Sequence, residues 1–212
     1  MAVAETTLER LLRAARDSPG TDATDERILD GALSAVAAYG PARATMDDIA
    51  EAAGVGRATV FRRFGAKEAV LSRLREREVS RFLAEADRRL DAIPDMAERV
   101  VEAFTLCVRT ARRHPWLERL VRTEPQHLVE LLRQGDPSPL TLAREFVASR
   151  LREDHPGAVA GPGADQRLAE LLIRLAFAYV MFPSELVDFD DRRRLRAFAT
   201  EMILPVVTGR MT

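Results

Sequence analysis

The sequence predicts an all-α fold, with a small N-terminal unit of three helices followed by a larger helical unit. Apolar residues recur at helical spacing in almost every segment, and no segment alternates apolar and polar residues as a half-buried strand would. Capping residues and Gly or Pro breaks delimit these segments. With 212 residues and 23.6 kDa, the chain is long enough for one or two domains with a sizeable core.

Composition argues against several classes of protein. No apolar run reaches the roughly 18 residues of a membrane span, and residues 1–20 lack the basic start and apolar stretch of a secretory signal. The single cysteine, Cys107, cannot form an internal disulfide and is typical of a reducing compartment. Three histidines and one cysteine offer few ligands for a metal site. We therefore expect a cytoplasmic protein without a membrane partner, metal or cofactor.

The overall charge is close to zero. The chain has 32 basic and 33 acidic residues, a net charge of −1, and Lys67 is its only lysine. This balance argues against a protein coated in positive charge for nucleic acid. Any nucleic-acid recognition must then be concentrated in a short part of the chain.

The first elements have clear start and stop residues. Residues 1–20 form a predicted extension, in which an apolar stripe over 6–16 indicates a short helix that ends at 18–20, Ser-Pro-Gly. The next helix begins near Thr24, whose side-chain oxygen can accept a hydrogen bond from an unpaired N–H group, and ends before Gly40.

Two short helices follow, joined by a glycine turn. The first begins at Thr45 with Asp48 in a near capping box, and Gly54 closes it. The second spans residues 57–64 and ends at Gly65. These are the dimensions of a helix-turn-helix.

The rest of the chain is also predicted to be helical. A long helix runs from Lys67 to Pro94, and the Gly/Pro-rich residues 154–164 form the clearest linker. Pro205 is expected to end the last helix. The other predicted helices are 96–113, 116–121, 125–134, 139–153, 165–182 and 191–204.

The second short helix is locally basic. From Arg57 to Lys67 the chain has four positive charges and no acid. Val60 and Phe64 are four residues apart and should face the core, which leaves the basic residues exposed. The second helix of a helix-turn-helix can enter the major groove of DNA. The alternative is an ordinary solvated face, against which the glycine turn and the short partner helix argue.

Residues 25–71 resemble the DNA-binding domain of the tetracycline-repressor (TetR) family of bacterial regulators. The family pattern is approximately T-x-x-x-I-A-x-x-A-G-V-S-x-x-T-L-Y-x-x-F-x-x-K-E-x-L. The matching positions are Thr45, Ile49, Ala50, Ala53, Gly54, Val55, Gly56, Thr59, Val60, Phe61, Phe64, Lys67, Glu68, Val70 and Leu71. Gly56 stands where serine is usual and Phe61 where tyrosine is usual, so one helix cap and one DNA-backbone hydroxyl are missing.

The resemblance implies a domain of residues 21–68 that binds an operator in double-stranded DNA. Thr45 would offer its hydroxyl and N–H to a phosphate, Lys67 would hold another phosphate, and Arg57 could contact guanine. Arg62 and Arg63 would reach base edges or flanking phosphates. The implied DNA-binding residues are Thr45, Gly56, Arg57, Ala58, Thr59, Phe61, Arg62, Arg63 and Lys67.

The resemblance also implies that residues 69–212 bind a small molecule and form a homodimer. The candidate pocket residues are Phe104, Cys107, Val108, Trp116, Leu120, His127, Leu131, Phe146, Leu175 and Tyr179. The last two helices have strongly apolar faces that could close a four-helix interface with a second copy. The candidate interface residues are Leu168, Leu171, Leu172, Leu195, Phe198, Met202 and Ile203. The alternative is that these two helices pack only within one chain.

We therefore expect a ligand-responsive repressor that binds a near-palindromic operator as a dimer and is released by a small apolar or amphipathic effector. One alternative is a ligand-independent DNA-binding regulator or an activator. Another is a helical enzyme with a small-molecule substrate. The sequence has no nucleophile elbow, phosphate loop, HExxH motif or Rossmann fingerprint, so we do not expect an enzyme.

Overall fold

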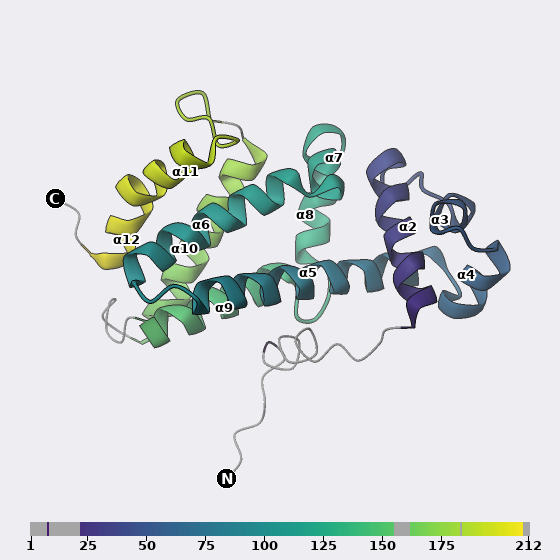
Figure 1. The fold of residues 1–212 in the computed structure, drawn as a ribbon, viewed down its shortest axis with the longest axis horizontal. Helices are drawn as coiled ribbons and strands as arrows, with labels where there is room; N and C mark the ends of the chain where they lie inside the picture. The colour runs from purple at the N-terminus through teal and green to yellow at the C-terminus, as the bar shows by residue number, and fades with distance from the viewer. Residues whose placement is uncertain (1–7, 9–21, 155–161, 183, 210–212) are drawn as a thin grey trace, which may run out of the picture. The chain divides into compact units, whose positions relative to one another are not determined.

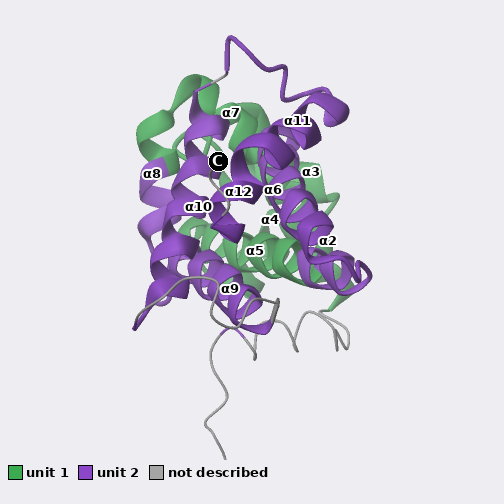
Figure 2. Cartoon of the chain, turned by 90° about the vertical axis from the view of Figure 1, so that its left-hand side faces the viewer, with its two compact units in different colours: residues 1–5, 9–84, 114–128 green, residues 6–8, 85–113, 129–212 purple. Residues whose placement is uncertain are grey.

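A computed structural model describes residues 8, 22–154, 162–182 and 184–209, and every regular element in these ranges is a helix (Figure 1). The predicted all-α fold is confirmed. The predicted helix over 6–16 lies, apart from Leu8, outside the described residues. The chain divides into two compact units (Figure 2). Of the described residues, unit 1 contains 22–84 and 114–128, and unit 2 contains the others.

Unit 1 is built from six helices or parts of helices. They are α2 (Ala23–Tyr39), α3 (Met46–Ala53), α4 (Arg57–Phe64), the first part of α5 (Lys67–Asp91), α7 (Pro115–Thr123) and the start of α8 (Pro125–Arg133). The predicted helix-turn-helix is confirmed as α3 and α4. The large side chains that are fully buried in this unit are Ile28, Leu29, Val36, Ile49, Val60, Val70, Leu74, Leu83, Leu120 and Leu128.

Helices α2 and α3 touch through their backbones at Gly31. A β-carbon at this position would lie 2.6 Å from the backbone nitrogen of Ala53 and 2.8 Å from the carbonyl oxygen of Ile49. Glycine normally weakens a helix interior. At this position glycine permits a close contact between α2 and α3, because any side chain would push the two helices apart.

A capping box fixes the start of α3. The N–H of Thr45 and its hydroxyl donate to Oδ2 of Asp48, at 2.8 and 2.7 Å, and the N–H of Asp48 donates back to the hydroxyl at 3.2 Å. The side-chain hydrogen bond from Thr45, followed by the backbone one, lowers the pKa of Asp48 below its usual 3.8. The aspartate therefore performs the role that glutamate usually has in this motif.

A buried arginine on α5 connects three helices of unit 1. Nη1 of Arg77 lies 3.1 Å from the carboxylate of Glu26 and 2.9 Å from that of Asp30, both on α2, and its side chain is only 8% exposed. Nη2 contacts Glu78, whose other oxygen lies 3.1 Å from Nε2 of His114 at the start of α7. Burial raises the pKa of Glu78, but the bonds to His114 and Arg77 outweigh it, so the net shift is downward.

Helix α7 belongs to unit 1, although its residues lie within the predicted second domain, residues 69–212. It packs against α2, and Nη1 of Arg119 donates to the carbonyl oxygen of Ala38 at 2.8 Å. A β-carbon at Gly40, which has a φ of 83°, would overlap the carboxylate of Glu124. The predicted functional division at residue 68 stays a prediction, because compact units do not assign function.

Unit 2 contains the end of α5 and most of the C-terminal half of the chain. Its further helices are α6 (Met96–Arg113), the end of α8 (Pro125–Arg133), α9 (Pro139–Asp154), α10 (Ala164–Met181) and α11 (Arg192–Phe198), followed by a π-helical turn, η1 (Ala199–Ile203), and α12 (Leu204–Thr208). α6 packs against α10, α11 and η1, and α9 packs against α10.

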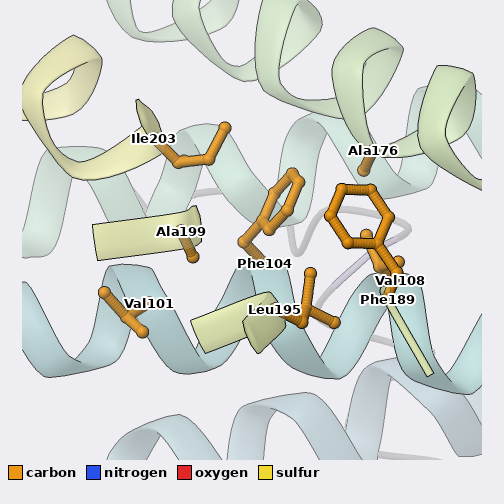
Figure 3. Packing of buried hydrophobic residues seen from close by; sticks show 8 residues of the cluster. All are labelled: Val101, Phe104, Val108, Ala176, Phe189, Leu195, Ala199 and Ile203. Carbon is orange, nitrogen blue, oxygen red and sulfur yellow. The ribbon is translucent and has the colours of Figure 1, made fainter. Parts of the chain in front are cut away.

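The core of unit 2 contains the rings of Phe104 and Phe189 among aliphatic side chains (Figure 3), with Tyr179 and Phe198 packed against it. The ring of Tyr179 lies edge-on to three others: Phe189 at 4.8 Å, Phe198 at 5.1 Å and Phe104 at 6.4 Å between centroids. Such edge-to-face pairs stabilise a core beyond the area they bury. Phe189 comes from the loop between α10 and α11, and it anchors that loop in the core.

The prediction that Pro205 ends the last helix is wrong. The chain passes through the π-helical turn η1 and continues as α12, in which Pro205 stands at the start. A proline in the first turn of a helix needs no N–H partner, so it is tolerated there. The wider turn therefore accommodates a residue that would break a continuous α-helix.

We expect Gly31→Ala to destabilise unit 1 by about 1–3 kcal/mol, because the methyl group forces α2 and α3 apart. At most helix positions this change stabilises. Urea unfolding followed by the fluorescence of Trp116 measures the effect, since this residue is the only tryptophan, is buried and lies in unit 1. Ser34→Ala on the exposed side of α2 is the control. A Gly31→Ala protein as stable as the wild type would contradict the close contact.

We expect Thr45→Ala to cost about 1 kcal/mol near neutral pH, because it removes the cap of α3. The pKa of Asp48 is lower in the folded state, so the stability that it contributes is present above its unfolded pKa and is lost as the pH falls through the folded one. The difference between wild type and variant should therefore shrink below about pH 4. Unfolding curves at several pH values measure it, with Thr123→Ala at the end of α7 as the control.

Candidate DNA-binding surface

The turn between α3 and α4 depends on glycine and on a bond from α2. Gly54 has φ 63° and ψ 38°, a left-handed conformation that disfavours a β-carbon. Nη2 of Arg27 donates to the carbonyl oxygens of Ala53, at 3.0 Å, and Gly54, at 2.8 Å. These bonds pair carbonyls that the end of α3 would otherwise leave to solvent.

One residue anchors α4 and most of its other side chains are exposed. Val60 is fully buried and Phe64 is half-buried, as the four-residue spacing predicted. Thr59 is half-buried, whereas Arg57, Ala58, Phe61, Arg62 and Arg63 are exposed. The N-cap Gly56 provides no side-chain bond to the helix start, and a β-carbon there would have space.

The four basic residues of this region have different surroundings. Nη2 of Arg63 lies 2.5 Å from Asp22, and Nη1 lies 2.8 Å from Asp25, at the start of α2. The bond to Asp25, followed by that to Asp22, raises the pKa of Arg63. Arg62 has no hydrogen bond or ion pair within the described part of the chain. Sequence reasoning gave the two arginines the same role, but among the described residues Arg63 has two acidic partners and Arg62 has none.

Arg57 is held from two sides. Its Nη1 lies 2.8 Å from Oδ2 of Asp47 on α3, and its guanidinium carbon lies 5.2 Å from the centre of the Phe61 ring one turn further along α4. Sequence reasoning missed Asp47, because nothing in the chain marks which acid lies opposite an arginine ten residues away.

The two predicted phosphate ligands already have partners. Nζ of Lys67 donates to the carbonyl oxygens of Pro41 and Ala42, each at 3.1 Å, which leaves one of its three N–H donors. The hydroxyl and N–H of Thr45 both bind Asp48. A phosphate at Thr45 would have to displace that carboxylate, so phosphate binding by these residues stays a prediction.

Five of the ten candidate pocket residues come together in unit 2. They are Phe104, Cys107, Val108, Leu175 and Tyr179, in and around the aromatic core. Burial raises the pKa of the Cys107 thiol to about 11, which disfavours a reactive thiolate. Phe146 is buried on α9 beneath the guanidinium of Arg150, at 5.7 Å. Leu131, half-buried on α8, is also in unit 2.

The other three candidate pocket residues lie in unit 1. Trp116 and Leu120 are buried on α7, and Nδ1 of His127 lies 2.9 Å from the carboxylate of Glu124. The structure therefore does not unite all ten in one compact unit. Phe189, which the sequence analysis did not name, belongs to the aromatic core; its only sequence signal is an isolated aromatic residue between acids.

The candidate interface residues are also divided. Leu195 and Ile203 are buried with the aromatic core, with Leu172 and Phe198 half-buried beside it, and Leu168 is buried between α9 and α10. Leu171 on α10 is 46% exposed and Met202 in η1 is 56% exposed. These two side chains are the ones in the set that a partner can contact directly.

No group of three or more His, Cys, Asp or Glu side chains in the described ranges could hold a metal ion. None of the described helices combines the length and the apolar character that crossing a membrane requires.

Comparison with known proteins identifies the same part of the chain as a recognised domain. Residues 28–74, which include α3 and α4, match the family described as "Bacterial regulatory proteins, tetR family". The uncharacterized HTH-type transcriptional regulator Rv1255c of Mycobacterium tuberculosis (strain H37Rv) is 29% identical over 188 residues, which cover 89% of this chain and 87% of that protein.

Two solved structures share the fold. One is the TetR family repressor AlkX from Dietzia sp. strain DQ12-45-1b, with a TM-score of 0.61 and 21% identity, covering 90% of this chain and 98% of that one. The other is FadR from Bacillus subtilis in complex with stearoyl-CoA, with a TM-score of 0.62 and 18% identity, covering 88% and 99%. The helix-turn-helix within residues 28–74 therefore matches the tetR family of bacterial regulatory proteins, and most of the chain is similar to a transcriptional regulator of the helix-turn-helix type.

Proposed function

We propose that the protein is a repressor that binds a near-palindromic operator as a homodimer and releases it when a small effector binds. The observation that carries this proposal is the exposed basic face of α4 on a helix-turn-helix that is bonded to α2 at Arg27 and near its start at Asp25. In this arrangement residues 21–68 bind DNA, and residues 69–212 provide effector binding and dimer contacts. The protein then works in the cytoplasm, where bacterial DNA lies.

Dimerisation follows from the small size of one α4 helix. A single helix-turn-helix makes few contacts, whereas two copies match the two halves of a palindromic site. If each subunit neutralises about four phosphates, the logarithm of the binding constant should fall against that of the salt concentration with a slope of roughly −7. The exposed Leu171 and Met202 support a second copy as the partner of α10 and η1.

An apolar or amphipathic effector suits unit 2. Five of the candidate pocket residues gather around an aromatic core, and they include the hydroxyl of Tyr179 and the thiol of Cys107. The related FadR of Bacillus subtilis was solved with stearoyl-CoA, an amphipathic molecule. AlkX from Dietzia, which shares the fold, is described as a repressor. Both similarities support the proposed class of effector and the proposed sign of regulation.

We expect Arg62→Ala and Arg63→Ala to have different effects. Arg62 is free, so its loss should weaken DNA binding and reduce the salt slope by about one per subunit. Arg63 joins α4 to α2, so its loss should chiefly lower the stability of unit 1. Binding is measured by fluorescence anisotropy on a duplex that the wild type selects from a randomised library, and stability by the fluorescence of Trp116. Loss of affinity in the Arg63 variant alone, with stability intact, would refute this division of roles.

We expect the wild type to sediment as a dimer of two 23.6 kDa chains at micromolar concentration. The double variant Leu171→Glu, Met202→Glu should sediment as a monomer, because it places charges in the proposed apolar interface. Leu186→Glu is a matched control: this leucine is 95% exposed but lies in the loop after α10. A monomeric wild type, or a control that dissociates equally, would argue against the proposed interface.

A further inference from the structure

We propose that Asp47 determines how selectively Arg57 recognises a DNA sequence. The carboxylate of Asp47 occupies Nη1 of the guanidinium, so that Arg57 binds guanine in preference to phosphate. This inference rests on the proposed operator binding through α4 and adds a residue to it that lies on the other helix of the motif.

The geometry restrains Arg57 without using all its donors. An arginine has five N–H donors, and the bond to Asp47 employs Nη1. The N–H groups of Nε and Nη2 make no hydrogen bond within the described residues. Phe61 supports the face of the guanidinium at 5.2 Å. The side chain is therefore held at two places while a pair of donors stays available.

Guanine and phosphate respond differently to such an arginine. Guanine offers the acceptors O6 and N7 to two parallel N–H groups, and this contact depends mainly on geometry. Binding to phosphate depends mainly on net charge. A carboxylate next to the guanidinium cancels much of its charge but leaves the donors of the free edge in place. Asp47 should therefore weaken binding to a duplex of unrelated sequence more than it weakens binding to the operator sequence.

The position of Asp47 strengthens this effect. It stands in the first turn of α3, where the helix dipole favours a negative charge, and its side chain is 60% exposed. If Arg57 swung away to a distant phosphate, Asp47 would lose its partner and stay near the negative backbone of DNA. The ion pair itself is exposed and weak, so the acid restrains the arginine without preventing its use.

The test compares Asp47→Asn with Glu51→Gln. Both changes remove one negative charge from an exposed position of α3, but only the first acts on Arg57. Each protein is titrated against two duplexes, one selected by the wild type from a randomised library and one scrambled, at several salt concentrations. The fluorescence of Trp116 establishes that each variant is folded.

We expect Asp47→Asn to bind the scrambled duplex more tightly by up to about fivefold per subunit, the value of a strong exposed ion pair. The salt slope should steepen by about one per subunit, and the ratio of selected to scrambled affinity should fall. Glu51→Gln should change the ratio by less than about twofold. Equal changes in the two variants, or an unchanged ratio in Asp47→Asn, would overturn the role of Asp47.

Replacing guanine by 7-deazaguanine in the selected duplex provides a second readout, because it removes the N7 acceptor. The wild type should lose about tenfold or more in affinity at one guanine of each half-site, and Arg57→Ala should lose nothing further there. If replacing each guanine left the affinity unchanged, the role of Asp47 and Arg57 would be overturned, but the proposed operator binding would stand. A wild type that selects no sequence from the library would overturn the proposed operator binding as well.

Discussion

The contact between α2 and α3 at Gly31 is the constraint on which the DNA-binding surface depends. Because Gly31 has no β-carbon, the end of α3 can lie directly on α2. This proximity lets Arg27 reach the carbonyls of the glycine turn. At the start of α2, Asp22 and Asp25 bind Arg63 of α4. Helix α2 therefore fixes both helices of the motif, although it has no part in the motif itself.

The 33 acidic residues balance the 31 arginines and the one lysine, and ion pairing decides which of these basic groups stay available to a partner. Arg77 is buried among the carboxylates of Glu26, Asp30 and Glu78, and Arg63 is held by two acids at the start of α2. Within α4 this leaves Arg62 free. Several basic groups of unit 1, among them Arg57, Arg63 and Arg77, have an acidic neighbour that limits their attraction to DNA.

Local signals predicted the helices well, and long-range contacts determined what sequence reasoning missed. The cap at Thr45, the turn at Gly54 and the spacing of Val60 and Phe64 act within a few residues, so they could be read directly. The difference between Arg62 and Arg63 depends on acids 38 or more residues away, which no local pattern reveals. The candidate pocket residues are divided between the two units for the same reason. The sequence of α7 is that of an ordinary amphipathic helix, and only its contacts with α2 place it in unit 1.

Helix α7 also provides a physical route for the proposed effector response. Its Arg119 holds the last turn of α2, and its Leu120 is fully buried, whereas α6 before it belongs to unit 2 and α8 after it passes into that unit. A rearrangement of unit 2 that moved either end of α7 must break the bond to Ala38 or displace α2. Since α2 carries both α3 and α4, displacement would change the orientation of α4 without altering any residue that touches DNA. In the proposed response, the effector would act on the support of the motif, and the residues of α4 proposed to read the operator would keep their own side-chain geometry.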